Sequence, residues 1–176
     1  MTVVKLILVI VSISLLLNCS KQPMTVSESE GSARNGRKAL INPFDLVGKS
    51  IADVENVLGK PSYSERRPAE YFKEEEFRHY TLSGIRELQI DYASGKVDGI
   101  WINLEEANQS KKPEDVLRRC GLNLKISDAK LEPLGDYWWK DAVDAKPFNS
   151  VHLVKFKDSG IFYQCHAFVS KSKAKP

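Results

Sequence analysis

The short amphipathic segment of residues 50–61 constrains the fold most. Ser50 can cap the free amides of a helix's first turn, and Asp53, three residues later, completes a capping-box pattern. Gly59 and Pro61 are typical helix-ending residues. The apolar residues recur at helical spacing, at Ile51, Val54 and Leu58. A helix of about two turns is unstable alone in water, so the rest of the chain must supply an apolar surface for it.

A predicted β-hairpin supplies that surface. Residues 87–92 alternate polar and apolar side chains, Ala93–Lys96 has turn composition, and residues 97–104 form the returning strand. A further strand is predicted over residues 77–82. With Ser94-Gly95 as a two-residue loop, the expected partners are Tyr92 with Val97, Ile90 with Gly99, and Leu88 with Trp101. These side chains would form one apolar face under the helix.

The same order of elements recurs later in the chain. Residues 113–121 begin with proline and end with glycine, which predicts a second short helix. Residues 151–156 and 161–169 flank a turn and predict a second hairpin. We therefore expect an α+β fold of tandem helix-plus-antiparallel-hairpin units, forming a curved sheet with helices packed on one face. The first unit would span residues 40–108 and the second residues 109–169.

The N-terminus is typical of an export signal. Lys5 precedes an apolar run, Leu6–Leu17, that is too short for a membrane-spanning helix of about 20 residues. The sequence Leu-Leu-Asn-Cys at residues 16–19 resembles the bacterial lipobox, which implies cleavage after residue 18 and lipid on Cys19. Two or more acyl chains give stable membrane anchoring. The alternative is an ordinary cysteine beside a cleavage site.

The segments at either end of the predicted domain are polar. Residues 19–39 contain too few apolar side chains to form a core, so we expect a lipidated N-terminus and a flexible tether. Residues 170–176 are expected to be a basic tail. Removing residues 1–18 takes one lysine and no acid from a chain with 26 basic and 23 acidic residues, which leaves a net charge of +2. This balance argues against a nucleic-acid partner.

Residues 46–61 carry a family resemblance. The stretches Leu46–Ser50, Asp53-Val54 and Leu58–Pro61, followed by a tyrosine-containing strand and a hairpin, resemble the SmpA/OmlA (BamE-like) lipoproteins and the wider β-lactamase-inhibitor-protein-like fold. The resemblance implies an envelope lipoprotein that binds another protein, in a family whose best-known role is outer-membrane barrel assembly. Ser20 after the cysteine is compatible with the outer membrane, facing the periplasm. The shared residues are turn and cap residues, so no partner-binding residue is transferred.

Two cysteines remain besides Cys19. Cys120 lies on the inward side of the second predicted helix, and Cys165 is expected on the apolar face of the last strand. An even pair in an oxidising compartment predicts a disulfide. Two buried free thiols are the alternative. His152 could join the cysteines in a zinc site, but no paired metal-ligand spacing supports it, so we expect no metal.

Neither a catalytic motif nor a cofactor motif is present in the sequence. It contains no Gly-x-Ser-x-Gly elbow, phosphate-binding loop or His-Glu-x-x-His pattern, so we predict a protein that is not an enzyme and that has no cofactor.

Aromatic residues are the candidates for protein binding. Trp138 and Trp139 are adjacent, so on a strand only one can face the helices while the other projects from the opposite face. The alternative for such residues is ordinary core packing. The candidate contact residues are Trp101, Trp138, Trp139, Phe162 and Phe168.

These observations together predict a membrane-anchored envelope lipoprotein that binds or scaffolds a protein partner. Its contacts would be membrane lipid, through the anchor, and an envelope protein. The alternative is a periplasmic inhibitor or ligand-sequestering module that uses the open face of the sheet.

Overall fold

The computed structural model describes residues 38–67 and 75–169. The predicted signal peptide, Cys19, the tether up to residue 37 and the basic tail lie outside the described residues. Within the described residues, no helix combines the length and apolarity needed to cross a membrane.

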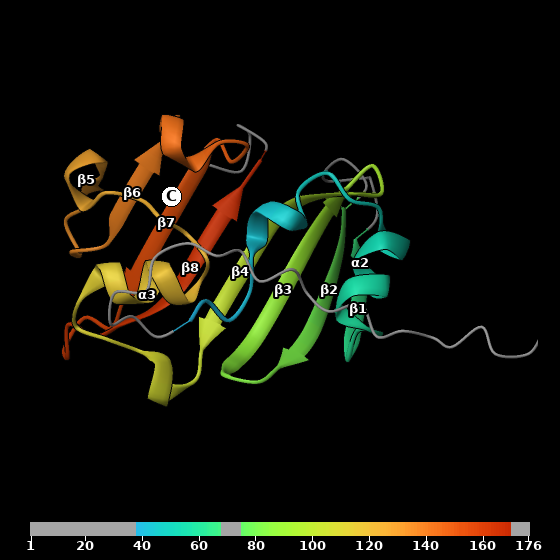
Figure 1. The fold of residues 1–176 in the computed structure, drawn as a ribbon, viewed down its shortest axis with the longest axis horizontal. Coiled ribbons are helices and arrows are strands. Elements are labelled where there is room, and N and C mark those ends of the chain that lie inside the picture. Colours follow the sequence, from blue (N-terminus) through green and yellow to red (C-terminus); the bar gives the residue numbers. More distant parts are fainter. Residues whose placement is uncertain (1–37, 68–74, 170–176) are drawn as a thin grey trace, which may run out of the picture. The chain divides into compact units, whose positions relative to one another are not determined.

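The described chain forms one antiparallel sheet of eight strands in the order β1-β2-β3-β4-β8-β7-β6-β5 (Figure 1). The strands are β1 (Tyr63–Arg67), β2 (Glu75–Leu82), β3 (Ile85–Ala93), β4 (Lys96–Leu104), β5 (Lys130–Leu131), β6 (Tyr137–Lys140), β7 (Ser150–Lys155) and β8 (Phe162–Phe168). The α-helices of this part of the chain are α2 (Ile51–Leu58) and α3 (Pro113–Arg119). Short 3₁₀ helices are η1 (Pro43–Asp45), η2 (Glu106–Asn108), η3 (Ile126–Asp128) and η4 (Val143–Ala145).

The predicted tandem of helix-plus-hairpin units is wrong. Strands β4 and β8 pair with each other and join every described strand into a single sheet. The expected hairpins are extended by β1 and β2 on one side and by β5 and β6 on the other. An isolated two-stranded hairpin leaves its edge amides and carbonyls unpaired and is marginal in water, which favours the larger sheet.

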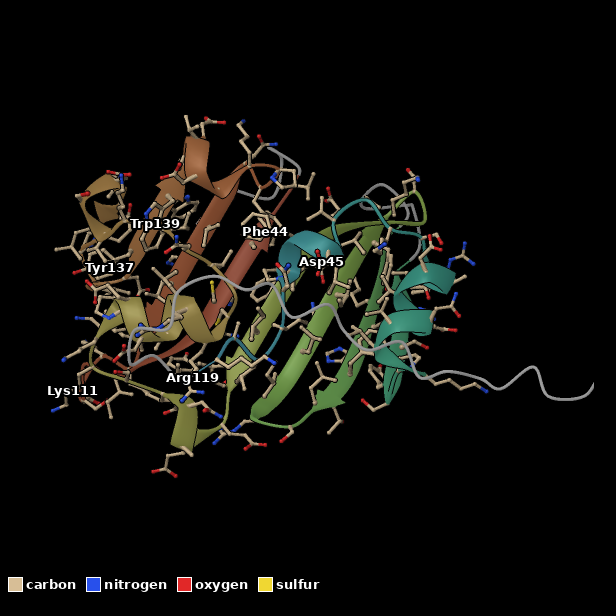
Figure 2. The ribbon with its side chains drawn as sticks, in the orientation of Figure 1. Phe44, Asp45, Lys111, Arg119, Tyr137 and Trp139 are labelled. Carbon is tan, nitrogen blue, oxygen red and sulfur yellow. The ribbon has the colours of Figure 1, made fainter. Side chains whose placement is uncertain are left out.

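The sheet rather than the helices supplies most of the core. Val54 of α2 and Val116 and Leu117 of α3 are the buried side chains of the two α-helices. Figure 2 shows Phe44 on η1 and Trp139 on β6, and both pack with the core. The strand residues of this core include Leu88, Ile90, Tyr92, Ile100, Ile102, Leu104, Val151, Leu153, Cys165 and Ala167.

The two helices begin and end where the sequence predicts. The Ser50 hydroxyl accepts a hydrogen bond from the Asp53 amide at 3.2 Å, and the Asp53 carboxylate accepts one from the Ser50 amide at 3.2 Å. This confirms the capping box of α2. Pro113 occupies the first turn of α3, and Gly121 follows its end with a φ of +72°.

Two β-bulges change the predicted registers. Tyr92 pairs with Val97 as expected, but Asp91 pairs with Gly99, so Asp98 is an extra residue in β4. Beyond this bulge Leu88 pairs with Ile102 rather than with Trp101. Because one extra residue reverses side-chain alternation, Trp101 is moved to the face opposite the core.

The second bulge lies in β8. Val154 pairs with Gln164 and Lys155 with Phe162, which leaves Tyr163 as the extra residue. Phe162 and Cys165 therefore both belong to the core. Tyr163 itself is not part of the core.

Candidate functional site

Four aromatic side chains form a row across four neighbouring strands, which we call the ring row: Trp101 of β4, His166 of β8, His152 of β7 and Trp138 of β6. Each residue is the direct cross-strand partner of the next. Directly paired residues project from the same face of a sheet. Their chain neighbours Ile102, Cys165, Leu153 and Trp139 belong to the hydrophobic core. The ring row therefore lies on the opposite face, which we call the second face.

Each histidine of the ring row packs against a tryptophan. The centroids of His166 and Trp101 are 3.7 Å apart, and those of His152 and Trp138 are 5.1 Å apart with stacked planes. The two imidazoles approach each other edge to face at 5.7 Å. Phe168 meets Trp101 edge to face at 5.4 Å. The rings thus form a small aromatic cluster separate from the main core.

A carboxylate lies near each end of the ring row. Trp101 Nε1 donates to Asp91 Oδ2 at 2.9 Å, and the side-chain amide of Gln89 donates to Asp91 Oδ1 at 2.7 Å. Asp136 Oδ2 lies 3.5 Å from His152 Nε2, and Asp136 Oδ1 accepts from the Lys155 amide at 3.0 Å. These contacts fix the orientation of Trp101 and His152.

Several polar atoms on the second face are buried without a hydrogen-bond partner among the described residues. They are His166 Nε2, Trp138 Nε1, Ser150 Oγ and Asn103 Oδ1. Ser150 and Asn103 each lie two residues from a member of the ring row, so strand alternation places them on the same face. An unsatisfied buried polar group costs about 1–3 kcal/mol. The second face therefore contains buried polar atoms whose loss of water is not compensated by hydrogen bonds among the described residues.

Both histidines of the ring row are neutral near pH 7. Burial, with a smaller contribution from the nearby His152, lowers the pKa of His166 to about 3. Burial also lowers the pKa of His152, although Asp136 and Glu132 act in the opposite direction. The middle of the ring row consequently carries no charge under ordinary conditions.

The Ser150 hydroxyl has no hydrogen-bond partner within the described residues, so no base is positioned to activate it. No three histidine, cysteine, aspartate or glutamate side chains in residues 38–67 and 75–169 are grouped to hold a metal ion. His152 is on the second face while Cys165 is in the core, so the alternative Cys-Cys-His zinc site is not formed.

The structure divides the five candidate contact residues between the two faces. Trp101, Trp138 and Phe168 are outside the main core and lie on the second face. Trp139 and Phe162 are core residues, and Trp139 Nε1 donates to the Lys125 carbonyl at 2.8 Å.

From the sequence, His152 is a candidate only for the alternative zinc site, and His166 is not among the candidate residues. The signal that could have identified them is their position between apolar neighbours in strands. His152 stands between Val151 and Leu153, and His166 between Cys165 and Ala167. Alternation then requires both imidazoles to project away from the core.

Cys120 and Cys165 lie together in the core. Cys120 follows α3, Cys165 is in β8, and both side chains are buried thiols in this structure. Their thiols are hydrogen-bonded to each other, and this contact together with burial raises the pKa of Cys120. The proximity agrees with the expected helix-to-sheet link, and the disulfide itself stays a prediction.

Comparison with known proteins gives no family assignment. No family model matches the chain, and no curated protein sequence matches it. One similar solved structure is a cysteine-rich secretory protein from Staphylococcus aureus subsp. aureus Mu50, with 7% identity over 78% of this chain and 48% of that chain, at a TM-score of 0.44. Another is an extracellular protein containing an SCP domain from Bacillus anthracis str. Ames, with 14% identity over 81% of this chain and 50% of that chain, at a TM-score of 0.40.

The chain thus spans about half the length of each of these two proteins. At TM-scores below 0.5 these similarities assign neither a family nor an activity to it. Neither protein is described as a SmpA/OmlA lipoprotein, so that resemblance stays a prediction.

Proposed function

We propose that this chain is a membrane-anchored envelope protein that binds another protein through the second face of its sheet, without catalysing a reaction. The observation that carries the proposal is the ring row, with the buried and unpartnered atoms His166 Nε2 and Trp138 Nε1. A partner whose docking moves the side chains over these atoms would supply the hydrogen bonds that they lack. Tryptophan is also among the residues that contribute most to protein interfaces.

The shape of the ring row favours a protein partner over a small molecule. Four strands at a spacing of about 4.8 Å place its ends about 14 Å apart. Small-molecule sites are concave and surround most of the ligand, whereas an extended row along a sheet fits a strand, loop or helix. The ligand-sequestering alternative has no comparable support in the described residues.

The membrane location in this proposal depends on Cys19, which lies outside the described residues. Its support is the apolar run that ends at a lipobox-like sequence. A lipid anchor would hold the binding face near the membrane and raise its effective concentration toward envelope proteins. A role in outer-membrane protein assembly is supported only by the resemblance of residues 46–61.

A site-specific crosslinking experiment tests the binding face. A photoreactive amino acid at Val154, beside the ring row on β7, is expected to capture a discrete protein in intact cells. The matched control places the same group at Val57, which is 60% exposed on α2. Equal products from both positions, or none from Val154, would contradict the proposal.

A substitution tests whether the ring row itself contributes to binding. Trp138→Ala is expected to weaken binding of the captured partner by about 30-fold, which corresponds to a hot-spot loss of about 2 kcal/mol. Val143→Ala, at a position 82% exposed on η4, should leave affinity unchanged. Separately, Cys19→Ala should move the protein from the membrane fraction to the soluble fraction, and retention on membranes would refute the anchor.

A further inference from the structure

Protonation of the His152–His166 pair would affect the packing of every ring in the ring row. The two residues are directly opposite each other on β7 and β8, with ring centroids 5.7 Å apart. Each imidazole packs against a tryptophan on its other side. His166 is only 8% exposed, so a charge on it would have little contact with water.

Among the described residues no acceptor is hydrogen-bonded to His166 Nε2, although Asn103 Oδ1 and Ser150 Oγ lie unpartnered on the same face. A neutral imidazole has one donor nitrogen and one acceptor nitrogen, whereas a protonated one needs two acceptors. His166 Nε2 has no hydrogen-bond partner among the described residues. The carboxylate near the pair is Asp136, and it lies against His152, at 3.5 Å from Nε2.

The other charged groups around the pair do not compensate for a charge on His166. Lys130 pairs with Trp138 and Lys140 pairs with Ser150, so both lysines lie on the second face and add positive charge. Asp91 is engaged by Trp101 and Gln89, and Asp98 lies at the β4 bulge. Asp136 and Glu132 favour the protonated form of His152. A positive charge on His152 disfavours protonation of His166.

We infer that the ring row is a pH-responsive contact, in which neutral His152 and His166 keep the four rings packed in a closed state and acid opens this packing by charging both imidazoles. The first proton would go to His152, because Asp136 partly neutralises it. The second would place a buried positive charge on His166 beside the first. Separation of the two imidazoles from each other and from Trp101 and Trp138 would relieve the repulsion and expose His166 Nε2 to water as an acceptor.

The direction of the pH effect follows from linkage. His166 in the closed state has a pKa of about 3, against an ordinary value of 6.5. Between these values an open or unfolded state binds more protons than the closed state, so the closed state loses stability as pH falls. Neutral His166 therefore leaves the closed state fully stable above pH 6.5. The stability of the closed state declines as the pH falls from 6.5 toward 3. The inference concerns the isolated chain and stands independently of the proposed partner.

The histidine content makes the test specific. The full sequence contains three histidines, and the third, His79, pairs with Glu87 at 2.9 Å in another part of the sheet. Imidazole proton resonances and tryptophan fluorescence of the full-length protein are recorded between pH 8 and pH 3. We expect the pKa of His152 to lie below 6.5 and His166 to remain neutral well below pH 6.5, followed by a coupled change in tryptophan emission.

Phenylalanine variants separate charge from packing. His166→Phe and His152→Phe keep an aromatic ring but remove the titrating group, so each should lower the midpoint of the acid transition by about 1 pH unit. His79→Phe is the matched control and should leave the midpoint unchanged. His166→Asn provides a second neutral variant in case phenylalanine prevents folding. Titration of wild-type His166 near 6.5 in the folded protein, or the same midpoint in all variants, would overturn the inference.

Discussion

Gly121 has the most restricted position of the described glycines. Its φ of +72° lies in the left-handed region, and an added Cβ would lie 2.1 Å from the Ile41 carbonyl oxygen and 2.8 Å from Pro43 Cδ. Glycine is therefore required both by the backbone conformation and by the close approach of the segment before η1. Gly160 has a similar φ of +67°, but nothing lies within 4 Å of an added Cβ.

This difference allows a matched pair of substitutions. Gly121→Ala should lower the free energy of unfolding by more than about 2 kcal/mol, because a left-handed alanine is strained and the backbone around Ile41 must move. Gly160→Ala should cost only about 1 kcal/mol, from the left-handed backbone alone. Urea denaturation measures both, and equal losses would show that the contact with Ile41 is unimportant.

The buried cysteine pair provides a second prediction at the scale of residues. When a disulfide compound such as oxidised glutathione accepts two electrons, the thiols of Cys120 and Cys165 lose two protons and form one sulfur–sulfur bond. The closed loop of about 46 residues would stabilise the fold by about 4 kcal/mol. Reductant should therefore lower the unfolding midpoint of the wild type.

Peptide mass measurement without reductant should find these two cysteines joined and two hydrogens lighter than the dithiol. A Cys120→Ala, Cys165→Ala variant is the control, and its stability should not respond to reductant. Recovery of both cysteines as alkylated thiols from the exported, unreduced protein would contradict the prediction.

At the scale of elements, α2 depends on its first residues. The Ser50 hydroxyl donates to the Asp53 carboxylate at 2.6 Å, and this bond together with the Ser50 amide lowers the pKa of Asp53. The helix has eight residues and one fully buried side chain, Val54, so packing alone holds it weakly. Capping therefore contributes a large part of its stability.

Removal of the cap should be measurable. Ser50→Ala is expected to lower the free energy of unfolding by about 1 kcal/mol and to move the pKa of Asp53 back toward 3.8. Ser127→Ala, at an exposed position in η3, should change stability by less than about 0.5 kcal/mol. Chemical denaturation and carboxyl NMR report the two effects. An unchanged Asp53 titration in Ser50→Ala would show that the capping box does not form in solution.

The β-bulges act at the same scale and determine which face carries the ring row. Without the extra residue at Asp98, the predicted alternation would place Trp101 under the helices. The extra residue at Tyr163 similarly sets the position of Phe162 in the core. A single inserted residue in each strand therefore controls the composition of both faces.

At the scale of the whole molecule, the pairing of β4 with β8 joins the first four strands to the last four. Ile102 of β4 is 1% exposed and pairs with Cys165 of β8. Residues from both sides of this pairing belong to the same hydrophobic core. We therefore expect the described part of the chain to unfold as one cooperative unit.

Ile102→Ala tests that expectation. Loss of this side chain from the core should cost about 2–5 kcal/mol while unfolding remains a single transition. Circular dichroism and tryptophan fluorescence should give the same midpoint, as they should for the exposed control Val143→Ala with its nearly unchanged stability. Two separate transitions in Ile102→Ala would show that the two sets of strands are independently stable.

Local sequence by itself determined the elements whose stability depends on neighbouring residues. The capping box of α2, the proline at the start of α3 and the turn around Ser94-Gly95 are all found where their residues predict them. Each involves contacts only a few residues apart along the chain, and turn and cap residues specify those directly.

Only the tertiary structure decided the pairing of β4 with β8, the two bulges and the ring row. Trp101, His166, His152 and Trp138 meet because strands distant in sequence adopt one register. Register and edge pairing depend on burial summed over the whole sheet, and one extra residue exchanges the faces. For this reason the sequence indicated aromatic contact residues, whereas the contact of the two histidines with each other and with the tryptophans was evident only once the sheet was assembled.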